Sequence, residues 1–152
     1  MAAATFYRSI HAFIIHPLVA ILAELMRSFL IAADISIANV LLDPLPNHRW
    51  RAKVTDYGSV NTLRMLNTAN PGSPVYAAPE ALDPSLQSTK MDIFSLGVLL
   101  IEMCAGQFPS NEDRECLLLT IQDRRFSDII SRCIARERDN RPTAGELLTL
   151  LH

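Results

Sequence analysis

The segment from Met91 to Cys104 constrains the fold of this chain more than any other part of the sequence. Nearly every position in it is apolar, and the apolar residues surround the full circumference of a helix. Such a helix needs cover on all sides, so the rest of the chain must be built around it. Thr89 and Asp92 predict a capping pair at its start, and Gly106 predicts its end.

Helical spacing marks three further elements that can provide this cover. Pro17 suits the first turn of an N-terminal helix. The apolar face of that helix comprises Leu18, Ile21, Leu22, Leu25 and Phe29. A later helix has its apolar face at Phe126, Ile129, Ile130, Cys133 and Ile134. Thr143 and Glu146 have the spacing of a capping box, which predicts where the last helix begins.

A small β-hairpin is predicted between the first of these helices and the apolar segment. Val40 to Leu42 and Trp50 to Thr55 are short β-prone runs, and the turn-forming residues of Asp43 to Asn47 separate them. The pairing would place Asn39 just before one strand and Asp56 just after the other. Both side chains would then lie at the same edge of the hairpin.

These elements predict one soluble domain, mainly α with a small β-hairpin. The chain has 152 residues, of which 49% are apolar, enough for a substantial core. The segment from Gly58 to Pro79 is predicted to be a loop. Loops of that length are uncommon in compact domains, so a functional role is favoured. No internal repeat or second domain is apparent in the sequence.

The charge, the cysteines and the N-terminal residues limit which binding partners and which cellular compartment the sequence favours. The formal net charge is -2 without long runs of like charge, which argues against nucleic acid as a partner. Three widely spaced cysteines fit a reducing, cytoplasmic compartment better than a disulfide framework or a zinc site. Only 15 uncharged residues separate Arg8 from Glu24, whereas a membrane-spanning helix needs about 20 apolar residues. A cleaved signal peptide with Arg8 as its basic region stays open as an alternative.

Three short motifs precede the apolar helix: Asp34 to Asn39, Asp56 to Gly58, and Ala78 to Glu80. Their order, spacing and predicted contexts resemble the C-terminal lobe of a eukaryotic protein kinase, of the serine/threonine or tyrosine-kinase-like type. The resemblance covers about 120 residues, from roughly Ala32 onward. The expected domain therefore spans residues 17–152, and residues 1–16 are left unassigned.

The resemblance implies a transfer of phosphate from MgATP to serine or threonine hydroxyls of proteins, with tyrosine as an open alternative. Asp34 would be the catalytic residue that orients the substrate hydroxyl and accepts its proton. Asn39 and Asp56 would ligate Mg²⁺ through hard oxygen atoms. Together with Gly58, they would form the cofactor-binding positions of this chain.

The resemblance also assigns residues to the substrate loop and to the architecture. Ser73 stands at the usual threonine position of the substrate loop, and Tyr76 stands where tyrosine kinases carry tryptophan. Glu80 and Arg141 resemble a buried ion pair that ties this loop to the helices. Asp92 resembles an aspartate that hydrogen-bonds the backbone of the catalytic loop.

The sequence also departs from the family pattern. Ala32 and Ala33 replace the histidine and arginine before the catalytic aspartate, so a phosphorylated loop would lack its arginine partner. Ser36 replaces a lysine that neutralises phosphate charge. No lysine occurs before Lys53 and no glycine before Gly58, so the Gly-rich loop and lysine of an ATP-binding N-terminal lobe are absent from this sequence.

Functions of different classes therefore remain open. The chain can be a fragment of a protein kinase that has little catalysis of its own, with protein substrates as partners. It can also be a non-catalytic, kinase-derived module that binds a regulatory protein. A secreted or membrane-tethered product that uses the apolar N-terminus is the third hypothesis.

Overall fold

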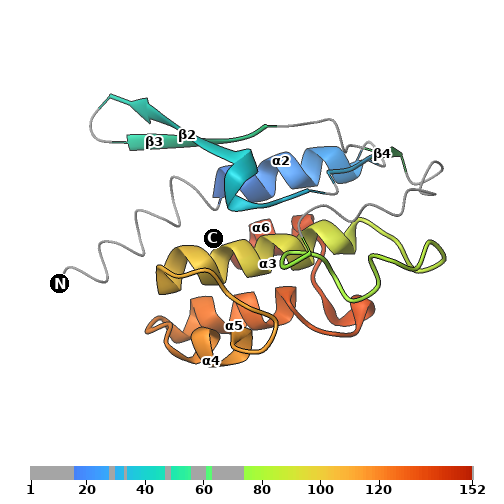
Figure 1. The fold of residues 1–152 in the computed structure, drawn as a ribbon. Coiled ribbons are helices and arrows are strands. Elements are labelled where there is room, and N and C mark those ends of the chain that lie inside the picture. The colour runs from blue at the N-terminus through green and yellow to red at the C-terminus, as the bar shows by residue number, and fades with distance from the viewer. Residues whose placement is uncertain are drawn as a thin grey trace.

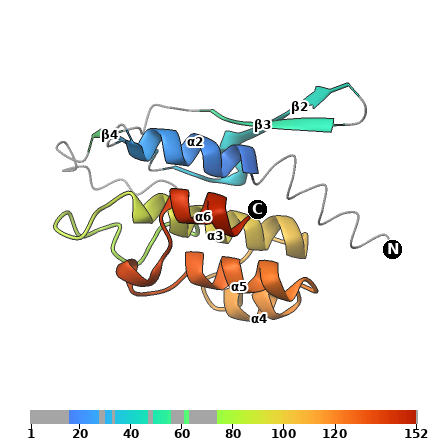
Figure 2. The same ribbon diagram turned by 180° about the vertical axis from the view of Figure 1, so that it is seen from behind.

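Helix α3 (Lys90–Ala105) lies at the centre of the fold, as its apolar sequence predicts. The structure is a computed structural model that describes residues 16–27, 30–32, 34–46, 49–55, 61–62 and 74–151. Ten of the 16 residues of α3 are buried. Figures 1 and 2 show α2 and the hairpin on one side of α3, and α4 and α5 on the other. The helix is therefore covered by elements from both ends of the chain.

The other described helices are α2 (His16–Arg27), α4 (Arg114–Leu119), α5 (Arg124–Cys133) and α6 (Ala144–Leu150). Helix α2 packs on α6, and α3 packs on α4 and α5. The predicted helices are confirmed, with Ile134 as the residue that ends α5. The short helix α4 was not predicted. No described helix has the length and apolar character needed to cross a membrane.

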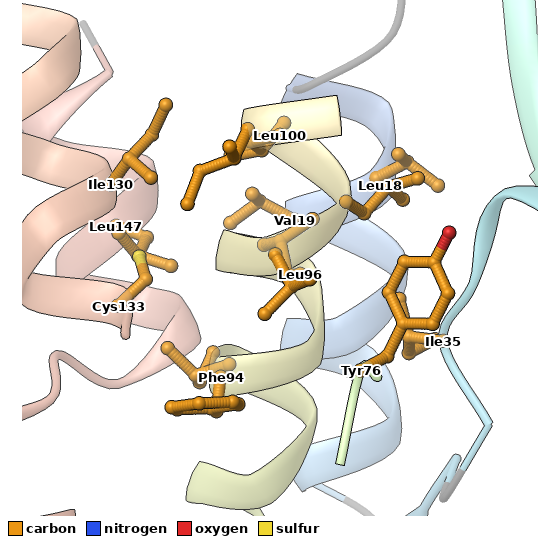
Figure 3. Close-up of a cluster of buried hydrophobic side chains, with 14 of the residues drawn as sticks. Leu18, Val19, Ile35, Tyr76, Phe94, Leu96, Leu100, Ile130, Cys133 and Leu147 are labelled. Atoms are coloured by element: carbon orange, nitrogen blue, oxygen red, sulfur yellow. The ribbon is translucent and has the colours of Figure 1, made fainter. Parts of the chain in front are cut away.

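The core joins side chains from all of these layers. Figure 3 shows Leu18 and Val19 of α2 beside Leu96 and Leu100 of α3, with Ile130, Cys133 and Leu147 from α5 and α6 to the left of α3. Leu18 is buried as predicted. Phe29 and the side chains of Ile21, Leu22 and Leu25 lie outside what the structure describes.

Gly97 allows α3 and α5 to approach closely. A Cβ atom at this position would lie 2.7 Å from Cγ2 of Ile134 and 2.8 Å from Cβ of Cys133. Both distances are too short for real carbon atoms, so only glycine fits here without a shift of α5. At the other end of α3, Gly106 has a φ of 68° and ends the helix in the left-handed conformation, as predicted.

The predicted hairpin is confirmed, with a first strand that is longer than expected. Strands β2 (Val40–Leu45) and β3 (Arg49–Val54) pair antiparallel, with Val40 opposite Val54 and Leu45 opposite Arg49. The prediction of a turn from Asp43 to Asn47 was wrong for its first three residues, which belong to β2. Proline at position 44 is tolerated because each strand of a two-stranded sheet is an edge strand.

A second strand pair was not predicted. β1 (Leu30–Ile31) pairs antiparallel with β4 (Asn61–Thr62), which lies inside the segment predicted as loop. Two residues are too few to give an alternating pattern, so the sequence carries no signal for these strands. The pair connects the chain just before Asp34 with the chain that follows the hairpin.

Candidate functional site

The loop that carries Asp34 is closed by Asn39. The Asn39 Nδ2 donates to the backbone carbonyl of Asp34 at 2.9 Å, so the structure brings these two predicted site residues together. A 3₁₀ turn, η2 (Ile37–Asn39), shapes the loop, and the Asn39 N–H donates to the Ser36 carbonyl at 3.1 Å. Donation through Nδ2 leaves Oδ1 as the atom with which Asn39 can ligate a hard cation.

Asp92 attaches this loop to helix α3. The backbone N–H of Ala32 donates to Asp92 Oδ2 at 2.8 Å, and both residues are buried. Burial of a carboxylate costs free energy unless the group accepts hydrogen bonds. The bond from Ala32 offsets part of this cost and fixes the start of the loop. The predicted capping pair of Thr89 and Asp92 was therefore wrong: Thr89 makes no side-chain cap bond, and Asp92 bonds a residue 60 positions earlier.

Strand β3 returns the chain to Asn39. The backbone N–H and the hydroxyl of Thr55 donate to the Asn39 carbonyl at 2.7 and 3.3 Å. The chain thus leaves the hairpin beside Asn39, as the predicted pairing requires. Asp56, Gly58 and Ser73 lie outside the described residues. Within the described part of the chain, no group of three or more histidine, cysteine, aspartate or glutamate residues could hold a metal ion.

Tyr76 is buried, with 4% of its surface exposed. Its hydroxyl donates to Glu102 of α3, and its carbonyl accepts from the Ser95 hydroxyl at 2.8 Å. Its ring meets that of Phe108 edge-on, with centroids 6.1 Å apart, and lies beside Ile35 (Figure 3). Burial, followed by the bond to Glu102 and its charge, raises the pKa of Tyr76, so the phenol stays a neutral donor at ordinary pH. Tyr76 thus fastens its segment to α3.

Glu80 and Arg141 form a buried, two-pronged ion pair. The Arg141 Nη1 and Nη2 atoms donate to the two carboxylate oxygens of Glu80 at 2.6 and 2.8 Å. The guanidinium carbon of Arg141 lies 4.9 Å from the centre of the Phe94 ring. Its remaining donors bond the carbonyls of Ala135, Lys90 and Arg136. This ion pair ties residue 80 to the chain between α5 and α6.

The sequence interpretation did not single out three residues that hold the segment after residue 74. Two are Ser95 and Glu102, which are rare polar residues in the apolar helix and were a signal that could have been used. The third is Arg114, whose Nη2 donates to the Val75 carbonyl at 2.7 Å. Arg114 lies in a charged stretch of sequence, where nothing distinguishes it from a solvated arginine.

The sequence of this chain is similar to the sequences of known proteins. The family described as the protein kinase domain matches residues 3–150. The serine/threonine-protein kinase dst1 of Dictyostelium discoideum is 32% identical over 133 residues, covering 76% of this chain and 17% of that protein. The mitogen-activated protein kinase kinases 3 and 1 of Arabidopsis thaliana are 33% and 30% identical, covering 79% and 78% of this chain and 26% and 39% of those proteins.

The chain thus spans well under half the length of these relatives. Its helical core and small hairpin fit the kinase-like lobe expected from the sequence. Because the family match covers nearly the whole chain, this protein belongs to the protein kinase family.

Proposed function

We propose that this chain carries the catalytic base and the substrate segment of a kinase that phosphorylates serine or threonine residues of proteins. The closed loop from Asp34 to Asn39 is the observation that carries the proposal. Asn39 fixes the Asp34 backbone from within the loop, and Asp92 attaches the start of the loop to the buried helix α3. A carboxylate on a loop held at both ends is suited to orient a hydroxyl group.

In this proposal, Asp34 accepts the proton of the attacking hydroxyl. The Asn39 Oδ1 and the Asp56 carboxylate supply hard oxygen ligands for Mg²⁺, and Gly58 belongs to the same turn. Mg²⁺ bound with ATP would neutralise charge on the phosphates. The Gly-rich loop and lysine that would cover those phosphates are not among these 152 residues, so this sequence does not fit a complete ATP site.

The names of the relatives favour serine and threonine as acceptors, because dst1 is named a serine/threonine-protein kinase. Ser73 and Tyr76 would belong to the segment that receives the protein substrate. We place the protein in the cytoplasm because its three cysteines are free thiols. Burial raises the pKa of Cys104 and Cys133 to about 12, so these two thiols are unreactive at neutral pH.

A non-catalytic module that binds a regulatory protein is the second candidate. Ser36, at the position of the lysine that neutralises phosphate charge, is only 4% exposed. Its hydroxyl carries no charge that could replace that lysine at the substrate. Ala32, at the position of the family histidine, contributes only a methyl group to the core.

A phosphotransfer assay separates the two candidates. The whole chain is incubated with Mg²⁺, radiolabelled ATP and a mixture of serine- and threonine-containing peptides. Asp34→Asn is compared with the parent chain and with Asp128→Asn, which changes an exposed aspartate of α5 in the same way. If the chain catalyses transfer, Asp34→Asn should lower the rate by about 10²–10⁴-fold and Asp128→Asn should leave it unchanged.

The absence of transfer by the parent chain would favour the binding module. Equal transfer by the parent and by Asp34→Asn would remove Asp34 from the catalytic role. Circular dichroism of each variant shows whether a lost rate reflects lost folding.

A further inference from the structure

Arg114 reaches from the first turn of α4 to a segment 39 residues earlier in the chain. Its Nη2 donates to the Val75 carbonyl at 2.7 Å and to Asn111 Oδ1 at 2.7 Å. The amide of Asn111 thus orients the same nitrogen that holds Val75. These bonds connect α4 directly with the backbone that leads into Tyr76.

The surroundings of Arg114 distinguish it from a solvated surface arginine. Its guanidinium carbon lies 5.2 Å from the centre of the Phe94 ring of α3. Its Nε is buried and has no hydrogen-bond partner among the residues that the structure describes, which costs free energy. Burial also lowers the pKa of Arg114, although the side chain remains a cation. The contacts through Nη2 and the ring hold the side chain in place despite these costs.

Two arginines lie against the same Phe94 ring and hold opposite ends of one segment. Arg141, at 4.9 Å from the ring centre, bonds the carboxylate of Glu80. Arg114, at 5.2 Å, bonds the carbonyl of Val75. Phe94 itself is buried in the core (Figure 3), so it gives both guanidinium groups a fixed support.

We propose that Arg114 is a positioning residue that fixes the N-terminal end of the segment from Val75 to Glu80. Arg141, which lies between α5 and α6, fixes the other end, so contacts with α3, α4 and this connection set the conformation of the segment without a phosphorylated side chain. This agrees with Ala33 at the position where the family carries a phosphate-binding arginine. The role of the segment in receiving a substrate rests on the function proposed above, whereas its anchoring by Arg114 does not.

Fluorine NMR of the whole chain labelled with 3-fluorotyrosine tests the anchor. The three tyrosines give three signals, and Tyr76→Phe identifies the one from Tyr76. Arg114→Lys keeps the charge but lacks the planar fork that bonds and stacks. The matched control is Arg125→Lys, because Arg125 Nη2 also donates to a carbonyl, that of Leu150, at 2.8 Å.

Arg114→Lys should abolish the Tyr76 signal at its original position, through a shift or broadening, and leave the other two signals in place. Arg125→Lys should leave all three signals unchanged. A Tyr76 signal that is unchanged in Arg114→Lys, or that changes equally in Arg125→Lys, would overturn the proposal.

If Arg114→Lys does not fold, Asn111→Ala gives the test, since it removes only the group that orients Nη2. It should change the Tyr76 signal in the same direction, and an unchanged signal would again overturn the proposal. None of these spectra requires ATP or catalysis. A chain without phosphotransfer activity can therefore still show the anchor, and an active chain can lack it.

Discussion

Two regions of this molecule are held together in different ways. From Pro74 to Leu151, helices pack around α3, and buried polar groups such as Glu80 and Arg141 bond one another. The hairpin of β2 and β3 is joined along its length by backbone pairing, and among its described side chains Ala52 and Val54 are buried. The first region depends on packing between side chains that are distant in sequence, and the second depends more on local bonds.

The two parts of the candidate site are also held in different ways. The segment from Val75 to Glu80 rests on the central helix of the core, whereas the loop with Asp34 lies between that helix and the hairpin. Ile37 within that loop is 49% exposed, and Leu41 in the strand that follows it is 53% exposed. The segment from Val75 to Glu80 is therefore the better supported of the two parts.

The largest expected effect is that of Glu80→Ala. It leaves the Arg141 guanidinium buried without its carboxylate partner, which should cost about 3–5 kcal/mol of unfolding free energy. Glu112→Ala is the matched control, because Glu112 is exposed before α4 and its loss should change the free energy by less than about 0.5 kcal/mol. Urea denaturation measures both. Equal midpoints would contradict the assigned contribution of the ion pair.

Replacing a leucine by alanine should lower the unfolding free energy much more in the helical region than in the hairpin. Leu96 of α3 is 0% exposed, and Leu96→Ala should cost about 2–5 kcal/mol through lost contacts and a cavity. Leu41→Ala in β2 removes an exposed side chain and should cost less than about 1 kcal/mol. Thermal unfolding followed by circular dichroism compares them. A larger loss of stability from Leu41→Ala than from Leu96→Ala would contradict the conclusion that the helical region depends more on side-chain packing.

A smaller effect is expected at the start of α6. Thr143 and Glu146 form the predicted capping box: Thr143 Oγ1 accepts from the Glu146 N–H at 3.2 Å, and Glu146 accepts from the Thr143 N–H at 2.7 Å. Thr143→Ala should cost about 1 kcal/mol at pH 7. Urea denaturation at several pH values measures the cost.

The pH dependence of this cap has a defined sign. The bonds from the Thr143 backbone and hydroxyl hold the pKa of Glu146 below its ordinary value. Such a carboxylate stabilises the fold above its unfolded pKa of about 4.3, and the stabilisation is lost as the pH falls through the lower, folded value. The cost of Thr143→Ala should therefore shrink in acid. A cost that grows as the pH falls would contradict the capping role.

The smallest expected effect lies in the hairpin. Lys53 of β3 pairs with Asp43 of β2, but their side chains are 52% and 42% exposed. Solvent screens such a pair, so Lys53→Ala should change the unfolding free energy by about 0–1 kcal/mol, with less effect in high salt. Urea denaturation in low and high salt checks this. A loss as large as that of Glu80→Ala would show that the hairpin is anchored as firmly as the helical region.

Much of the helical region could be predicted from the sequence, because its signals are local or periodic. The apolar circumference of α3, the spacing of α5 and the capping box each determine a feature within a few residues. The hairpin could be predicted from its turn residues, although the first part of the expected turn continues strand β2. The family resemblance added Glu80 and Arg141, which are 61 residues apart and have no local signal.

The remaining contacts depend on tertiary geometry. Local spacing placed Asp92 in a helix cap, whereas the family resemblance assigned it to the backbone of the catalytic loop, and Asp92 accepts a hydrogen bond from the Ala32 N–H, 60 positions earlier. Strands β1 and β4 have only two residues each and form because the chain around them brings them together. Arg114 bonds a carbonyl, which every residue carries, so its partner Val75 has no distinguishing sequence feature.

Native-state hydrogen exchange in increasing denaturant tests the difference between the two regions most directly. The amides from Leu96 to Ile101 should exchange only through global unfolding, with the largest free energies in the chain. The amides of β2 and β3 should exchange through a smaller opening, with free energies lower by about 2 kcal/mol or more. Equal exchange free energies in α3 and the hairpin would contradict the conclusion that the helical region is more firmly held than the hairpin.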